Sequence, residues 1–126
     1  MKYNIPKIFF FLPSLFYYGL IFFLSSQSYQ VKVDILFYDK LIHFIEFGIL
    51  GFLLSLGFFV VNVSFKKKFI WVLFIGFVLA LFDEIHQYFV PLRELEVFDL
   101  TADVIGVIGG FFIFTYFCKK TNLTYS

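Results

Sequence analysis

Residues 41–63, LIHFIEFGILGFLLSLGFFVVNV, form an apolar run in which His43 and Glu46 are the only ionisable residues. An α-helix rises about 1.5 Å per residue, so this run is long enough to cross a hydrocarbon core of about 30 Å. Similar runs lie at 8–26, 69–90 and 100–118. None has the apolar–polar alternation of membrane β-strands, and a backbone in lipid must satisfy its own hydrogen bonds. The sequence therefore predicts an all-α polytopic membrane protein, a bundle of four transmembrane helices.

The composition fits this class and excludes others. Hydrophobic residues make up 61% of the 126 residues and the mean hydropathy is +0.92, whereas soluble domains are about 45–50% apolar. The length suits a single domain, which we assign to residues 1–126. The longest basic run covers only residues 66–68, so no nucleic-acid partner is expected. Cys118 is the only cysteine, which excludes an internal disulfide and a CxxC motif.

The basic residues predict how the helices cross the membrane. If the N-terminus is cytoplasmic, the inner side receives seven of the ten Lys and Arg residues, namely Lys2, Lys7, Lys66, Lys67, Lys68, Lys119 and Lys120. The positive-inside rule then favours an N-in/C-in protein. On this topology all nine acidic residues lie in outer loops or outer halves of helices. A cleaved signal peptide is a weaker interpretation of residues 8–26, because the run is long for one and the rest of the chain is itself apolar.

Polar residues gather at the predicted outer ends of three helices. They are Asp39, Lys40, His43 and Glu46 in the second, Asp83, Glu84, His86 and Gln87 in the third, and Asp99 and Asp103 in the fourth. Spacings of three and four residues place those of each helix on neighbouring positions of one face. Ionisable groups at membrane depth cost about 2.5–3.5 kcal/mol each, so they should face one another or water. We therefore expect an outward-facing polar pocket in which Lys40, His43 and Arg93 balance the carboxylates.

Roles within this pocket follow from side-chain chemistry. The candidate catalytic residues, as acids and bases, are His43, Asp83 and Glu84. The candidate binding residues are Asp39, Lys40, Glu46, Gln87, Arg93, Asp99 and Asp103, with Lys40 and Arg93 suited to phosphate. In the fourth helix Gly106, Gly109 and Gly110 follow the carboxylates, and glycines at such spacing let another helix approach closely.

Three other interpretations stay open. The polar residues could form a structural network that only holds the bundle together. A metal site is a second reading, since His43-x-x-Glu46 and Asp83-x-x-His86 resemble the paired motifs of di-metal bundles, but the usual order is not repeated and we assign no metal and no cofactor. A serine hydrolase is the weakest, because Ser25 lies in no nucleophile-elbow motif and is read as an interfacial helix end.

The ordered motifs resemble the VanZ-like family of membrane proteins. The matching stretches are LSSQS at 24–28, DKLIHF at 39–44, DEIHQ at 83–87 with Pro91 and Arg93 after it, and DLTADVIG at 99–106. Together they cover nearly the whole chain, and the ordered set is more specific than any one motif. Family members often have Asn where this chain has Asp103, and Gly before the Arg where this chain has Leu92.

The resemblance implies a multi-pass protein of the bacterial cytoplasmic membrane whose first helix is retained. The family is named for a low-level teicoplanin-resistance protein, so the resemblance implies a link to glycopeptide resistance that the residues alone do not carry. Two function classes follow. In one, the pocket binds or modifies an envelope lipid or lipid-linked headgroup. In the other, the same carboxylates serve a non-enzymatic transport, proton-relay or assembly module, and the sequence leaves enzyme activity and oligomeric state undecided.

Reporter fusions test the orientation. Fusions after Lys68 and Lys120 should report a cytoplasmic location, and fusions near Lys32 and Glu94 an extracytoplasmic one, because of the uneven distribution of Lys and Arg. An extracytoplasmic signal after Lys68 would show that the orientation is inverted.

Overall fold

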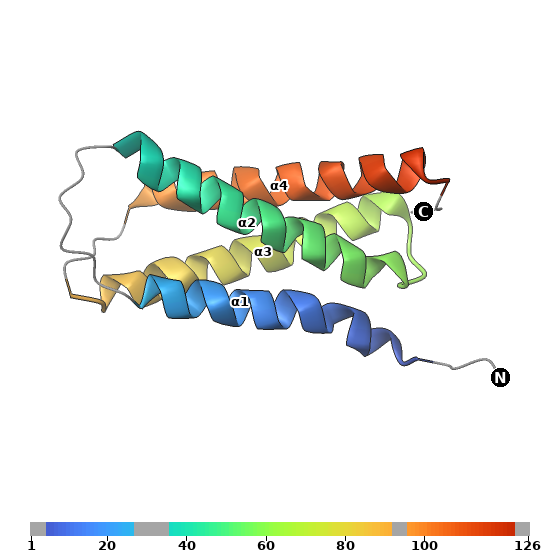
Figure 1. The fold of residues 1–126 in the computed structure, drawn as a ribbon, viewed down its shortest axis with the longest axis horizontal. Helices are drawn as coiled ribbons and strands as arrows, with labels where there is room; N and C mark the ends of the chain where they lie inside the picture. Colours follow the sequence, from blue (N-terminus) through green and yellow to red (C-terminus); the bar gives the residue numbers. More distant parts are fainter. Residues whose placement is uncertain (1–4, 27–35, 92–95, 123–126) are drawn as a thin grey trace.

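The computed structural model describes residues 5–26, 36–91 and 96–122, and all regular structure within them is helical. A 3₁₀ turn, η1 (Lys7–Phe11), leads into α1 (Leu12–Ser25). The helices that follow are α2 (Leu36–Phe59), α3 (Phe65–Tyr88) and α4 (Val97–Lys120), and the four run side by side in one bundle (Figure 1). The predicted all-α bundle of four helices is confirmed.

The described chain holds four helices that are long and apolar enough to cross a membrane, at Lys7–Ser25, Asp39–Phe59, Phe65–Tyr88 and Val97–Lys120. Large apolar side chains cover their outward surfaces, as lipid requires; Phe16 is 74% exposed and Phe98 is 76% exposed. The chain is therefore a multi-pass membrane protein. Which side of the membrane each end faces stays a prediction.

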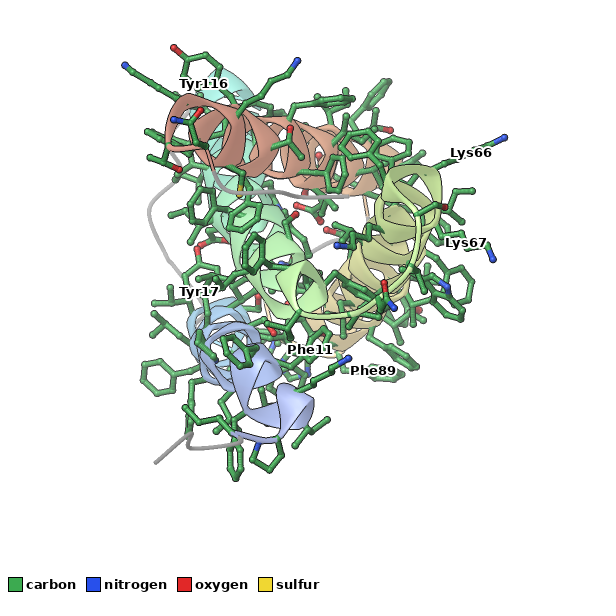
Figure 2. All side chains as sticks on the ribbon, turned by 90° about the vertical axis from the view of Figure 1, so that its right-hand side faces the viewer. Phe11, Tyr17, Lys66, Lys67, Phe89 and Tyr116 are labelled. Carbon is green, nitrogen blue, oxygen red and sulfur yellow. The ribbon has the colours of Figure 1, made fainter. Side chains whose placement is uncertain are left out.

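The two ends of the bundle differ in chemistry. We call the end where α1 and α3 finish and α2 and α4 begin the site end, because most of the buried polar residues of the described chain, and all of its buried carboxylates, lie there. We call the opposite end the lysine end, after the lysines that begin α3 and finish α4. Viewed from the lysine end, Lys66 and Lys67 point away from the bundle (Figure 2).

The helices extend beyond some of the predicted apolar runs because they continue through polar residues. α2 begins at Leu36 and not at residue 41, so Asp39 and Lys40 lie inside the helix. α3 begins at Phe65 because Ser64 caps it, with Ser64 Oγ accepting a hydrogen bond of 3.4 Å from the Lys67 N–H. α4 is longer than 100–118 at both ends, whereas α2 and α3 end before residues 63 and 90.

Two glycines of α4 bring it into backbone contact with α2. A Cβ atom on Gly110 would overlap the carbonyl oxygen of Gly48, and one on Gly106 would overlap the carbonyl oxygen of Phe44. Gly109 was predicted to share this role, but its nearest neighbour would be the ring of Phe44 at 3.9 Å. Within α4 the close approach needs the pair at 106 and 110, four residues apart on one helix face, and Gly51 of α2 meets the backbone of Val107 in the same way.

The apolar core lies between the buried polar residues of the site end and the lysine end. Its centre consists of fully buried side chains from α2, α3 and α4, including Leu50, Val72, Val107 and Phe111. Helix α1 is the most weakly attached of the four and lies on the side of the bundle away from α4 (Figure 2). It packs through Ile21, and the Tyr18 hydroxyl donates a hydrogen bond of 2.9 Å to the carbonyl of Leu79 in α3.

Substitution of the two neighbouring glycines should separate helix packing from helix propensity. Gly110→Ala should lower the free energy of unfolding by at least about 1–3 kcal/mol, because the added methyl forces two backbones apart. Gly109→Ala should be neutral or stabilising by up to about 1 kcal/mol, because its methyl meets only the Phe44 ring, at an ordinary van der Waals distance. Thermal unfolding in detergent measures both, and equal effects would contradict the assigned contact.

Candidate functional site

All four helices contribute to a buried polar cluster at the site end. None of its members is more than 4% exposed: Ser25, His43, Asp83, Glu84, Gln87, Asp99 and Asp103. Such groups stay in a membrane protein only when they face one another, water or a ligand. The predicted convergence of α2, α3 and α4 at one polar site is what the structure contains, and α1 takes part as well.

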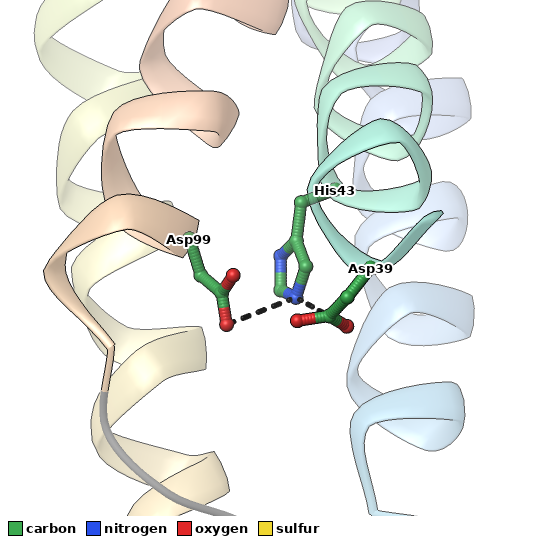
Figure 3. A group of neighbouring side chains, drawn as sticks. All are labelled: Asp39, His43 and Asp99. Carbon is green, nitrogen blue, oxygen red and sulfur yellow. Dashed lines mark ion pairs between the residues drawn. The ribbon is translucent and has the colours of Figure 1, made fainter. Parts of the chain in front are cut away.

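His43 lies at the centre of the cluster, between α2 and α4. Its Nδ1 is 2.9 Å from Asp103 Oδ1, a hydrogen bond when Nδ1 carries a proton. On the other edge of the ring, Nε2 is 3.7 Å from Asp99 Oδ2 and 3.9 Å from Asp39 Oδ1 (Figure 3). The imidazole thus has carboxylates on both of its nitrogens.

Lys40 neutralises part of this negative charge. Its ammonium group donates hydrogen bonds to Asp99 Oδ1 and Glu96 Oε2, and lies 3.6 Å from Asp39 Oδ2. Asp39 and Asp99 therefore each direct one oxygen towards Lys40 and the other towards His43. The predicted role of Lys40 and His43 in balancing carboxylates agrees with these contacts.

Asp83 joins α3 to α1. The Ser25 hydroxyl donates a hydrogen bond of 2.6 Å to Asp83 Oδ1, and the Gln87 amide donates one of 3.1 Å to Asp83 Oδ2. Ser25 is the last residue of α1, as expected of a helix end, but its side chain is buried inside the cluster. The neighbouring Ser26 is the exposed residue at the helix end.

Two buried carboxylate oxygens have no hydrogen-bond partner within the described chain. They are Glu84 Oε1 and Asp103 Oδ2. The other oxygen of Glu84 accepts only a long bond, 3.5 Å, from the backbone N–H of Glu96. Buried acceptors are normally satisfied, so each of these two oxygens calls for a proton, a water molecule or a bound cation.

A pocket of about 190 Å³ opens beside the cluster, between α1, α2 and α3. Polar side chains form most of its wall: Ser25, Asp39, His43, Glu46 and Gln87, with Leu24 and Ile42. The pocket gives His43 and Glu46 a surface that a small polar group can reach.

The structure brings together nearly all of the predicted site residues. Of those named from the sequence, the described chain places these at the site end: Asp39, Lys40, His43, Glu46, Asp83, Glu84, Gln87, Asp99 and Asp103. Arg93 lies outside the described residues, so its role stays a prediction. From the sequence, Ser25 is considered only as a hydrolase nucleophile or a helix end, although the LSSQS motif contains it. Glu96 was not named as a site residue, and its only signal was its position just before α4.

His86 does not join the cluster, although it lies three residues from Asp83. Its ring stacks on Phe22 at 3.9 Å, and its Nε2 lies 2.8 Å from the exposed Ser26 Oγ. The di-metal motif considered from the sequence, which paired His43 with Glu46 and Asp83 with His86, is therefore not assembled in this fold.

Comparison with known proteins identifies one family. The family model described as VanZ-LLP1: VanZ/LLP1 matches residues 3–119. No curated protein and no solved structure matches the chain. The resemblance inferred from the motifs is thereby confirmed.

Adjacent serines test the hydrogen bond between α1 and α3. Ser25→Ala removes a donor to the buried Asp83 and should lower the free energy of unfolding by about 1–3 kcal/mol. Ser26→Ala is the matched control, since that hydroxyl is exposed, and should change it little. Thermal unfolding in the same detergent compares them, and equal stability of the two variants would contradict the importance of the Ser25–Asp83 contact.

Proposed function

Since the chain belongs to the VanZ/LLP1 family, we propose that it works in the cytoplasmic membrane of a bacterium and binds the polar headgroup of an envelope lipid at the site end. The observation that carries this proposal is the polar pocket beside His43, placed at one end of a bundle otherwise surrounded by lipid. At about 190 Å³ the pocket suits part of a headgroup and not a whole lipid.

The charges of the site favour one class of headgroup. Among the described residues, seven carboxylates lie at the site end, and two basic residues, Lys40 and His43, contact some of them. The carboxylates are those of Asp39, Glu46, Asp83, Glu84, Glu96, Asp99 and Asp103. Carboxylates accept hydrogen bonds from hydroxyl and ammonium groups and repel phosphate. Lys40 already donates to two of them, so it is a poor phosphate ligand. We therefore infer a hydroxyl- or amine-bearing headgroup, such as the sugar of a lipid-linked saccharide.

The acyl part of such a lipid also has a place along α1. An apolar pocket of about 260 Å³ lies nearer the lysine end between α1, α2 and α3, and its wall includes Leu15, Tyr18, Leu54 and Leu79. Ser25 and Tyr18 are seven residues apart, so both pockets adjoin the same face of α1. A lipid lying along this weakly packed helix would extend from polar surroundings at its headgroup into apolar ones.

Any chemistry on the headgroup would start at His43. Asp103 on Nδ1 holds the ring, and a carboxylate partner of this kind keeps an imidazole oriented for acid–base work. Asp83 and Glu84 remain candidate acid–base groups on the α3 side. Binding alone, in a transfer or assembly role, uses the same contacts, and a link to teicoplanin resistance would follow if the bound lipid is a cell-wall precursor.

A proton relay across the membrane has less support. Next to Asp83 and Asp103 the core becomes apolar, with Val72, Val107 and Phe111 fully buried. The buried polar cluster is confined to one half of the bundle, which suits a ligand that arrives from one side of the membrane. We therefore rank the proton relay below headgroup binding.

The two histidines offer a matched test of lipid binding. Protein purified in mild detergent should carry a defined lipid species, detected by mass spectrometry. His43→Gln should reduce the amount of bound lipid at least tenfold, because the pocket loses the imidazole ring that lines it. His86→Gln should retain it, because His86 lies outside the pocket.

The amount of folded protein in the membrane is the control for both variants. Equal lipid retention in folded His43→Gln and His86→Gln would refute binding at this pocket. Loss of folded protein together with lipid in His43→Gln would assign His43 a structural role instead.

A further inference from the structure

Three side chains from three helices form a group with the geometry of a metal site. His43 of α2, Asp83 of α3 and Asp103 of α4 each present one ligand atom, and these atoms lie within 4.8 Å of one another. The three residues are 3%, 0% and 0% exposed. We propose that they bind a divalent transition-metal ion, of which Mn²⁺ and Zn²⁺ are the best-suited examples.

The distances agree with such an ion. Neighbouring ligand atoms around a six-coordinate ion with bonds of about 2.1 Å lie about 3 Å apart. His43 Nδ1 and Asp103 Oδ1 are 2.9 Å apart, so a metal ion can replace the proton between them with little movement of either helix.

A second observation points to a cation independently of this grouping. Asp103 Oδ2 is buried without a partner in the described chain, and so is Glu84 Oε1 on the adjoining helix. The Asp103 carboxylate accepts only from His43 through its other oxygen. A cation bound through both oxygens of Asp103 would satisfy Oδ2 and would reduce the excess of carboxylates over basic residues among the described residues of this end.

The surrounding contacts resemble those that support metal ligands. When His43 binds through Nδ1, its Nε2–H faces Asp99 and Asp39, and metal-bound histidines commonly direct the second nitrogen to a carboxylate (Figure 3). Ser25 and Gln87 hold the Asp83 carboxylate by hydrogen bonds. Both kinds of contact fix the orientation of a ligand before an ion arrives.

A second group, Asp39 with His43 and Asp99, has similar spacing but is the weaker candidate. Both of its carboxylates already direct an oxygen towards Lys40, and the Asp39 side chain is 45% exposed. One imidazole nitrogen with carboxylate oxygens favours Mn²⁺ or Zn²⁺ over Mg²⁺ and Ca²⁺, which prefer oxygen ligands alone.

Titration with Mn²⁺ tests the site without lipid substrate or activity. The full chain, purified in detergent and treated with a chelator, is titrated with Mn²⁺ while electron paramagnetic resonance follows the free ion; Zn²⁺ is then added as a competitor. We expect one saturable site per chain that Zn²⁺ displaces. Asp103→Asn keeps the hydrogen bond to His43 but removes the charged ligand, and should weaken binding at least tenfold.

His86→Gln is the matched control, because His86 contacts Phe22 and Ser26 and lies outside the group of His43, Asp83 and Asp103, so it should leave Mn²⁺ binding unchanged. Asp83→Asn is the second ligand variant, used with thermal unfolding to show that each protein is folded. Absence of saturable binding to the folded wild type would overturn the proposal, and so would loss of binding in His86→Gln with retention in Asp103→Asn. Lipid retention is measured separately, so failure of the metal site leaves the headgroup proposal to be judged by its own experiment.

Discussion

The contact between the backbones of α2 and α4 sets most of the distances in the polar site. Gly106 and Gly110 allow α4 to touch α2 near Gly48, and this holds the first turns of the two helices close together. Asp99 and Asp103 precede these glycines at spacings of three and four residues, so one face of α4 carries carboxylates first and small residues after them. A wider separation at the glycines would move the carboxylates away from His43. The apolar packing of the bundle and its polar chemistry therefore depend on the same helix face.

This arrangement concentrates negative charge where it is costly. A carboxylate at membrane depth costs about 2.5–3.5 kcal/mol, and a network that served only packing would be expected to pair each acid with a base or a donor. Lys40, Ser25 and Gln87 do this for Asp99 and Asp83. They do not do it for Glu84 Oε1 and Asp103 Oδ2, which are buried without a hydrogen-bond partner among the described residues. These unpaired carboxylate oxygens are the main physical reason to regard the cluster as a ligand site and not as a structural network that only holds the helices together.

The parts of this structure that follow from hydropathy and helical spacing could be predicted from the sequence. Four apolar runs specified four helices, and the energetic cost of charge in lipid required the polar ends of α2, α3 and α4 to face one another. The role of α1 could not be derived in this way, because Ser25 is a single small residue at the end of an apolar run and its partner depends on packing. The prediction that His86 shares a helix face with Asp83 was wrong for a geometric reason. Asp83, Glu84 and Gln87 point to one side of α3, and His86 lies about 100° from that side around the helix axis. Glu96 precedes a helix, where hydropathy carries no information about contacts.

His43 connects the two proposed ligands through the two nitrogens of one ring. The inner nitrogen, Nδ1, faces Asp103, whereas Nε2 faces the more exposed carboxylates next to the polar pocket. A neutral imidazole has one N–H and one lone pair, so a metal ion on Nδ1 would keep the proton on Nε2. The outer nitrogen would then donate a hydrogen bond to Asp99, Asp39 or a headgroup oxygen, and it could not act as a base. Metal binding would thus change His43 from an acid–base residue to a positioning residue and leave proton transfer to the carboxylates. Glu84 is the first candidate among them, because its Oε1 has no hydrogen-bond partner among the described residues. The inner and outer halves of the site are in this sense chemically coupled, because both include the His43 ring and an aspartate of α4.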